Sequence, residues 1–208
     1  MTKTLVIDCS LSKSAKNGEL VGALKRFSEC ITVPFSAIRA DYRIEMDVDA
    51  VVLSGSAARI VKPSHRDMFT ATIDLINCLD LPILGICYGH QLLCWSLGCS
   101  VASLARPVID RFEEVHVLEV DEIFAGFEER KTIPLAQSHY DYVERGSLAP
   151  ADCILLANSP SCEVEAVRHK YSPFYGVQFH PERIKLKDRT CLEGHKVIEN
   201  FYNNVVKR

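Results

Sequence analysis

Residues 85–91, Gly-Ile-Cys-Tyr-Gly-His-Gln, follow a short apolar run at 81–84 and precede a stretch with helical spacing. This order predicts a buried strand, a sharp turn with Cys87 at its apex, and a helix that begins at the turn. Glycines two residues on either side of Cys87 permit a tight, strained turn, as they do in a Gly-x-Ser-x-Gly nucleophile elbow. Cys87 is therefore predicted to be a nucleophile rather than one more buried thiol.

A candidate base for Cys87 lies far downstream. Residues 174–182 read Phe-Tyr-Gly-Val-Gln-Phe-His-Pro-Glu, with apolar side chains at every second position from 175 to 179. This alternation predicts a strand, in which His180 and Glu182 project to the same side. Pro181 between them fits the end or edge of a strand. The Glu182 carboxylate can then orient the imidazole, which predicts a triad of Cys87, His180 and Glu182.

Together, residues 85–91 and 176–182 resemble the two motifs of the class I (triad) glutamine amidotransferase family, and the resemblance covers nearly the whole chain. Within that family, residues 138–141 and 161–164 look most like the glutaminase part of GMP synthetases. The resemblance implies an α/β, flavodoxin-like fold, with a mixed sheet that has a parallel centre and an antiparallel flank.

The resemblance also implies an activity, the hydrolysis of L-glutamine to glutamate and ammonia. Cys87 would attack the side-chain amide carbon, and His180 would protonate the departing ammonia. Water activated by His180 would then cleave the γ-glutamyl thioester. L-glutamine is accordingly the expected small-molecule ligand.

The tetrahedral intermediate of this reaction needs backbone donors. One is expected at the N–H of Tyr88, and the resemblance places the other in the turn at Gly55 and Ser56. The family usually has two glycines and a proline there, whereas this chain has serine and then Ala57 after Gly55. Serine resists a positive φ, so the change either leaves the oxyanion hole less well formed or is neutral.

The resemblance assigns the binding of glutamine to Gln91, Tyr140 and Asp141. Gln91 can equally be an ordinary polar residue of a helix's first turn. Tyr140 stands where GMP synthetases commonly have glycine, so its ring either narrows the pocket mouth or points outward. His139 is expected to be structural. No histidine shows metal-ligand spacing, and we expect no metal and no cofactor.

The rest of the chain fits one domain over residues 1–208. Strands are expected at 5–7, 50–53, 82–86, 114–120, 133–137, 153–157 and 163–168, and helices at 19–30, 67–79, from the elbow to 97, and 197–206. Strands that alternate with helices predict a parallel sheet with the active site at its carboxyl edge. The short turns of the second half predict antiparallel pairing.

Composition excludes several other classes of protein. A hydrophobic content of 48%, a charged content of 25% and a net charge of −3 suggest neither a nucleic-acid nor a membrane partner. No apolar stretch is long enough to span a bilayer or to form a signal peptide. The odd count of nine cysteines, without a Cys-x-x-Cys pair, predicts a reducing, cytoplasmic location. Small buried hydrophobes are expected at Cys30, Cys78, Cys94, Cys153 and Cys162.

The chain contains no phosphate-binding glycine loop. If it supplies ammonia for a synthesis, we expect a separate ATP-dependent synthetase subunit, of the GMP synthetase kind. Two alternatives stay open: a free-standing γ-glutamyl hydrolase, which the departures at Ser56 and Tyr140 favour, and a non-catalytic regulatory protein, which the triad opposes. The basic residues of 183–189 are expected to form a solvated loop or to dock an acidic partner.

Overall fold

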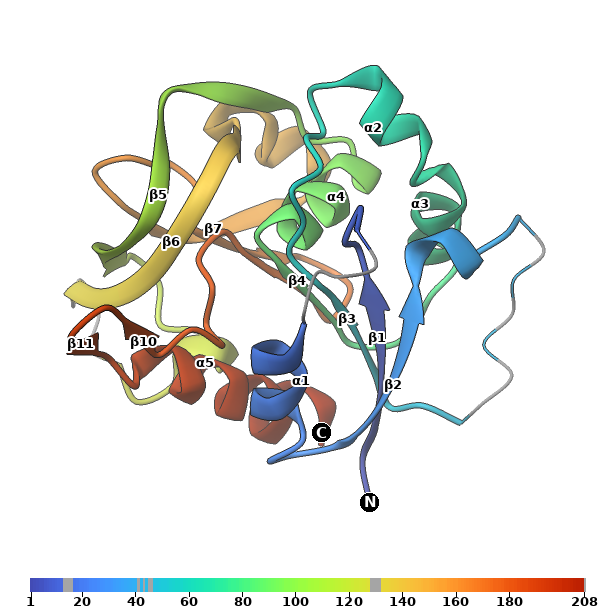
Figure 1. Ribbon diagram of the computed structural model, residues 1–208, viewed down its shortest axis with the longest axis horizontal. Coiled ribbons are helices and arrows are strands. Elements are labelled where there is room, and N and C mark those ends of the chain that lie inside the picture. Colours follow the sequence, from blue (N-terminus) through green and yellow to red (C-terminus); the bar gives the residue numbers. More distant parts are fainter. Residues whose placement is uncertain (13–16, 41, 43, 45–46, 128–131, 208) are drawn as a thin grey trace.

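A single mixed sheet organises the molecule. Figure 1 shows the computed structural model, which describes all residues except 13–16, 41, 43, 45–46, 128–131 and 208. In this described part the sheet has nine strands, in the order β2-β1-β3-β4-β9-β8-β7-β5-β6. The strands are β1 (Lys3–Asp8), β2 (Glu29–Pro34), β3 (Ala50–Leu53), β4 (Ile83–Ile86), β5 (Val101–Val117), β6 (Thr132–Val143), β7 (Cys153–Asn158), β8 (Ala166–His169) and β9 (Phe174–Val177). The neighbours from β2 to β9 are parallel and the rest are antiparallel, as the sequence predicted.

Helices cover both faces of the parallel half, which explains why its central strands β3 and β4 are apolar and buried throughout. The helices are α1 (Gly18–Leu24), α2 (Pro63–Asp67), α3 (Thr70–Asn77), α4 (Tyr88–Ser96) and α5 (Glu193–Phe201). Val6, Val52 and Leu84 pack on the face of α1 and α5. The alternate residues, such as Leu5 and Val51, pack on the face of α3 and α4. This sandwich holds the carboxyl ends of β3 and β4 in place.

The antiparallel flank curls away from this plane. β5 spans 17 residues and pairs with β6 through two register shifts between Ser103 and Arg111. In Figure 1 the two strands arch together on the side of the molecule opposite α3. The arch brings β6 back toward the end of β9, where the His180 N–H donates to the Ala136 carbonyl at 2.8 Å. The flank therefore forms one wall over the carboxyl edge of the parallel strands.

Several predicted boundaries were wrong. The helix expected at 19–30 ends at Leu24, because residues 29–34 pair with β1 as strand β2. The helix expected at 67–79 is shorter than predicted: α3 covers Thr70–Asn77, and a separate helix, α2, precedes it and ends at Asp67. The strand expected over 163–168 begins only at Ala166, and the one leading to His180 ends at Val177. The last helix begins at Glu193, earlier than predicted, and continues as a π-helical turn over Tyr202–Val206.

The basic segment after the second motif is solvated, as predicted for Lys185, Lys187 and Arg189, but its backbone forms a short hairpin rather than a loop. Strands β10 (Lys185–Leu186) and β11 (Arg189–Thr190) pair with each other. Arg183 donates to Asp110 of β5 at 2.9 Å, and Arg189 lies 3.6 Å from Glu114 of β5. The flank itself thus supplies acidic partners for this segment.

The nine cysteines all lie within the described residues, and all are free thiols. Cys94, Cys153 and Cys162 are buried, as predicted. The prediction was wrong for Cys78, which is exposed, and for Cys30, which is only half-buried. A search of the described residues finds no helix with the length and apolar character of a membrane span.

Candidate active site

Cys87 occupies the strained turn that the sequence predicts between β4 and α4. Its backbone has φ 53° and ψ −106°, an unfavourable conformation for a residue with a side chain, which costs about 1–3 kcal/mol. A Cβ on Gly89 would lie 2.3 Å from the Leu53 carbonyl oxygen, and one on Gly85 would lie 2.5 Å from the Gly89 oxygen. Both glycines are therefore required for α4 to begin this close to the sheet. The Cys87 N–H donates to the Val177 carbonyl at 2.8 Å, which ties the turn to β9.

His180 and Glu182 form the predicted pair, although not on a continuous strand. His180 makes one isolated bridge to β6, and Glu182 lies in the turn that follows. His180 Nδ1 donates to Glu182 Oε1 at 2.8 Å, and the two side chains are only 14% and 9% exposed. The contact orients the ring as the third member of a triad does.

The surroundings of His180 favour its protonated form. Burial by itself lowers the pKa of His180, but the nearby Glu182 carboxylate and Cys87 sulfur, which both hydrogen-bond to the ring, outweigh burial and hold that pKa well above its ordinary value. The ring can therefore carry a proton beside the sulfur of Cys87. An imidazolium in this position is a ready general acid for a leaving group.

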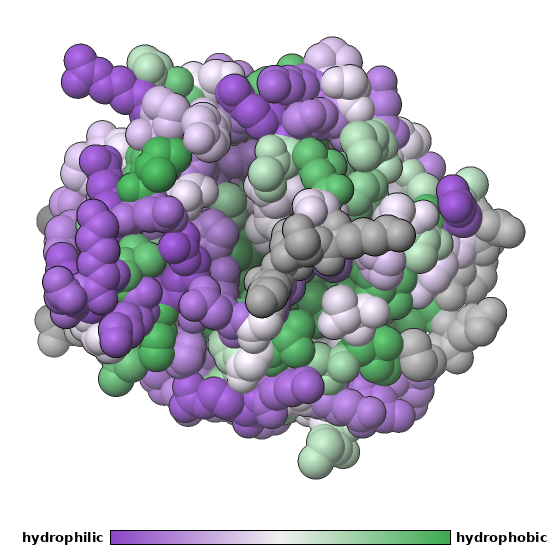
Figure 2. All heavy atoms as spheres, in the orientation of Figure 1, coloured by the Kyte–Doolittle hydropathy of each residue, from purple (hydrophilic) through white to green (hydrophobic). Residues whose placement is uncertain are grey.

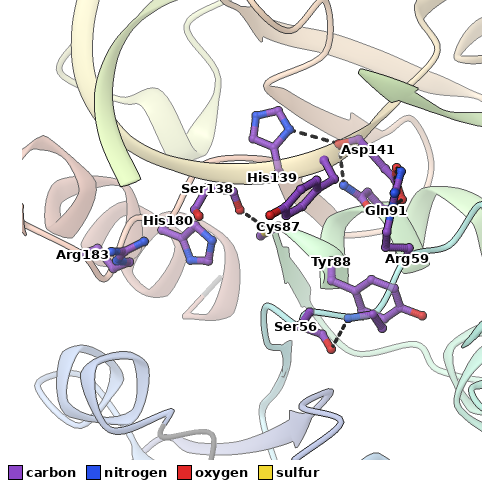
Figure 3. Close-up of a pocket in the computed structure, with 13 residues that line it drawn as sticks. Ser56, Arg59, Cys87, Tyr88, Gln91, Ser138, His139, Asp141, His180 and Arg183 are labelled. Carbon is purple, nitrogen blue, oxygen red and sulfur yellow. Dashed lines mark hydrogen bonds and ion pairs between the residues drawn. The ribbon is translucent and has the colours of Figure 1, made fainter. Parts of the chain in front are cut away.

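A pocket of about 280 Å³ opens over Cys87 (Figure 3). The parallel half and the flank both contribute to its lining, which comprises Ser56, Ala57, Ala58, Arg59, Cys87, Tyr88, Gln91, Ser138, His139, Tyr140, Asp141, His180 and Arg183. Gly55 lies directly against the reactive pair, because a Cβ there would be 3.0 Å from His180 Cε1 and 3.6 Å from Cys87 Cβ. The structure thus brings all the predicted site residues to one place, with Glu182 behind His180.

Ser56 adopts its position without the strain that the sequence suggested. Among the described non-glycine residues, a positive φ occurs at Cys87, Asp110, Asp152 and Lys187, and Ser56 is not one of them. Its hydroxyl accepts from the Ala58 N–H at 3.0 Å and so stabilises the turn. The serine therefore fits this backbone as readily as a glycine would.

Gln91 joins the two halves of the pocket. Its side-chain Nε2 donates to the Asp141 carbonyl at 2.8 Å and to Gln178 Oε1 at 3.0 Å. The residue is 3% exposed, so this is a buried link rather than a surface contact of a helix's first turn. Gln91 both lines the pocket and holds the β6 segment against α4.

Sequence reasoning missed Arg59, which lies at the edge of the pocket. Its guanidinium contacts both carboxylate oxygens of the buried Asp141, and Nε lies 3.1 and 3.2 Å from them. The same guanidinium lies 5.6 Å from the ring centroid of Tyr140, which is 51% exposed. The Tyr140 ring is thus half-exposed beside Arg59 at the pocket edge. No local motif marks Arg59, because its partner is far away in the chain.

Comparisons with known proteins agree with this geometry. Residues 5–204 match the family model "Glutamine amidotransferase class-I". The chain therefore belongs to the class I glutamine amidotransferase family, and the sequence-based identification of the family and its fold is confirmed.

Among its relatives are subunits of the glutamine-hydrolysing GMP synthases of two archaea. The subunit of Methanothermobacter thermautotrophicus is 40% identical over 131 residues, which are 63% of this chain and 64% of that protein, just under two thirds of its length. The subunit of Methanosarcina barkeri is 37% identical over 170 residues, 82% of this chain and 78% of that protein.

Solved structures share the fold. A Thermoplasma acidophilum protein, described as a candidate subunit of GMP synthase, superposes with a TM-score of 0.81 at 27% identity and covers 100% of this chain and 95% of its own. A glutamine amidotransferase from Methylobacillus flagellatus has a TM-score of 0.70 at 15% identity, covering 99% of this chain and 94% of its own, and supports the fold alone.

Proposed function

We propose that this chain is a glutaminase subunit that hydrolyses L-glutamine and supplies the ammonia to a separate ATP-dependent synthetase subunit of the GMP synthase kind. One observation carries this proposal: Cys87, on its strained turn, and His180 line the same pocket, and Glu182 holds the His180 ring from behind. The names of the related proteins, which are subunits of a glutamine-hydrolysing GMP synthase, support the acceptor and the partner.

The proposed reaction begins when the Cys87 sulfur attacks the side-chain amide carbon of glutamine. The carbon–sulfur bond forms, the carbon–nitrogen bond breaks, and His180 gives its proton to the leaving nitrogen, which departs as ammonia. Water then loses a proton to His180 and attacks the thioester, so that glutamate leaves and the Cys87 thiol is restored. The Glu182 carboxylate stabilises the imidazolium in both steps.

Backbone N–H groups beside Cys87 would stabilise the negative charge of the tetrahedral intermediate. The Tyr88 N–H lies at the start of α4, where the unpaired N–H groups of a helix favour a developing negative charge. The turn at Gly55 and Ser56 lies against Cys87 and can supply the second donor. We assign the binding of the substrate's α-amino and α-carboxylate groups to the edge of the pocket at Gln91, Tyr140 and Asp141.

In this proposal, residues 1–208 form one catalytic domain. One continuous sheet runs from β2 to β6 through both halves of the site, and the family match spans residues 5–204. A division of the chain would separate Cys87 from the wall that β6 provides. The ATP-dependent chemistry is accordingly assigned to the partner.

The test measures glutamate release by the purified chain from L-glutamine and from a γ-glutamyl dipeptide. We expect turnover of glutamine that rises when a GMP synthase synthetase subunit from a relative is added with its substrates, and no turnover of the dipeptide. Robust hydrolysis of the dipeptide by the chain alone would replace the proposal with a free-standing γ-glutamyl hydrolase. Cys87→Ala is the control for a contaminating glutaminase.

A further inference from the structure

Three buried side chains with metal-ligand chemistry meet behind the wall of the Cys87 pocket. One ligand atom each from His139, Cys162 and Glu165 lies within 4.8 Å of the other two. Their exposures are 3%, 2% and 0%. His139 belongs to β6, whereas Cys162 and Glu165 belong to the connection between β7 and β8, so the fold and not a sequence motif assembles the group.

The hydrogen bonds of His139 leave one ring nitrogen available. Nδ1 lies 3.1 Å from the Asp141 carbonyl oxygen and therefore donates to it. Nε2 then carries a lone pair, and it is buried without a partner among the described residues. In Figure 3 the ring projects from β6 away from Cys87. A histidine that donates one N–H to a carbonyl and keeps the other nitrogen free is the usual form of a metal ligand.

The two carboxylate oxygens of Glu165 also differ in their hydrogen bonding. Oε1 accepts from the Ser159 hydroxyl at 2.7 Å, and the Gln137 side chain also interacts with the carboxyl group, but Oε2 makes no hydrogen bond of ordinary geometry among the described residues. Ser159 also accepts the Cys162 N–H, at 3.1 Å on its hydroxyl, so one turn positions both the thiol and the carboxylate. Ser159 would not contact a bound ion itself, but its hydrogen bonds would orient two of the side chains that do.

The cluster lacks the solvation that a thiolate or a carboxylate needs. Glu165 is 0% exposed and Cys162 is 2% exposed, so water does not solvate the charged form of either side chain. The carboxylate of Glu113 adds further negative charge to the surroundings of both groups. A cation among these groups would supply the stabilisation that water does not.

We propose that His139, Cys162 and Glu165 bind a divalent cation of Zn²⁺ chemistry. Imidazole nitrogen, thiolate sulfur and carboxylate oxygen are the three ligand types that Zn²⁺ accepts, and a fourth position would hold water. The cation would bind the deprotonated thiolate and carboxylate forms of Cys162 and Glu165. The site is separate from the proposed glutaminase chemistry, which uses Cys87 and His180.

A second pocket lies beside this cluster. Cys162 and Ser159 line this pocket of about 310 Å³, together with Ser161 and Tyr142. That pocket is distinct from the one over Cys87, which none of these four residues lines. A bound ion would tie β6 to the β7–β8 connection. It would thereby hold Ser138, whose carbonyl accepts the Cys87 thiol at 3.6 Å.

The test uses Co²⁺ as a spectroscopic probe in the full-length Cys87→Ala protein, where the proposed catalytic thiol is absent. We expect one Co²⁺ per chain, with intense thiolate-to-cobalt charge-transfer absorption that Zn²⁺ abolishes by competition. Cys162→Ser should lose that absorption, and Cys153→Ser, which changes another buried thiol, should keep it. Because no readout depends on glutamine turnover, the result is independent of the proposed function.

Two milder variants protect the test against a failure to fold. Ser159→Ala removes only the orienting hydroxyl and should weaken Co²⁺ binding by about 10–100-fold. Glu165→Gln removes one ligand charge and should weaken it further, while circular dichroism shows an unchanged fold. Absent charge-transfer absorption in Cys87→Ala, its persistence in Cys162→Ser, or unchanged affinity in both Ser159→Ala and Glu165→Gln would each overturn the proposal.

Discussion

The strands of the two halves of the sheet, with their adjoining loops, bury different kinds of polar side chain, whereas helix α4 on the parallel half buries His90 and Gln91. In and beside strands β1 to β3, the buried polar groups are small hydroxyls, namely Thr4, Ser28 and Ser54. In the flank and at its junction with β9 they are amides, an imidazole and carboxylates, namely Gln137, His139, Asp141, Glu165 and Gln178. Large polar groups are costly to bury unless they are paired. The parallel half thus acts as a rigid support, and the flank supplies the polar wall of the pocket.

The largest expected effect on activity comes from the parallel half of the sheet, where the strained turn positions Cys87. Cys87→Ala should lower glutamine hydrolysis by roughly a thousandfold or more, because no thioester can form. Glutamate release measures the effect, and an unchanged melting temperature shows that the fold is intact. Cys78→Ala, at an exposed thiol, is the matched control. Comparable loss in both variants would show that Cys87 is not the nucleophile.

The second-largest expected effect on activity comes from the junction between the two halves of the sheet, where β9 ends and β6 pairs with His180. Glu182→Gln should lower hydrolysis by roughly 10²–10⁴-fold, because the amide orients the imidazole poorly and does not stabilise its charge. The variant should also lower the pKa of His180, which the Glu182 carboxylate raises. An NMR titration of the His180 ring measures that pKa, and an unchanged value would contradict the assignment.

The same variant gives a pH dependence of stability with a defined sign. A histidine whose pKa rises on folding stabilises the protein fully below its unfolded pKa of about 6.5, and this contribution is lost as the pH rises through the folded-state pKa. The stability difference between the native protein and Glu182→Gln should therefore be largest near pH 6 and should shrink at alkaline pH. Thermal unfolding across this range measures it, and a difference that grows with pH would be the wrong sign.

A third variant tests how tightly the support is packed. Gly89→Ala should destabilise the protein by about 3 kcal/mol, because its Cβ would lie 2.3 Å from the Leu53 carbonyl oxygen and α4 must shift. Gly22→Ala in α1 is the matched control, since a Cβ there meets no atom within 4 Å. That control should be neutral or stabilising by up to about 1 kcal/mol. Denaturant unfolding compares them, and equal stabilities would mean that the elbow tolerates a side chain.

The smallest effect tests the polar wall of the flank. Arg59→Lys keeps a positive charge but loses the two-pronged contact with Asp141, and it should cost about 1 kcal/mol because Arg59 is 28% exposed. Arg189→Lys, at an exposed pair with Glu114, should change stability by less than about 0.5 kcal/mol. Denaturant unfolding also measures these values. A larger cost at Arg189 would reverse our ranking of buried and exposed pairs.

Local signals predicted the elbow, because a strained turn must have small residues at fixed positions. Gly85 and Gly89 flank Cys87 at the spacing that close packing requires, and Gly98, with a positive φ of 96°, ends α4. The contact between His180 and Glu182 was predicted correctly, but the backbone conformation predicted for these residues, an extended strand, was wrong. The strand ends at Val177, and a turn rather than an extended chain brings the carboxylate to the ring.

Signals that depend on distant partners were missed. Arg59 has no motif, and its partners Asp141, Tyr140 and Ser103 all lie far away in the chain. The full length of β5 was also missed, because its register shifts and its exposed face interrupt the alternation that marks a strand. The helix expected over residues 19–30 was too long, because helical spacing over one or two turns does not exclude a strand that begins at Glu29.

The amino-acid sequence by itself determined the family, the alternation of parallel strands and helices, and the identity of the candidate triad. These features depend on glycine placement, apolar periodicity and short motifs, which act within a few residues. Only the tertiary structure decided how the flank arches back over Cys87 and that the Arg59 guanidinium lies beside Asp141. It also decided that His139, Cys162 and Glu165 lie close together. Those contacts join residues far apart in the chain, and burial makes such polar groups stable only when the whole fold supplies their partners.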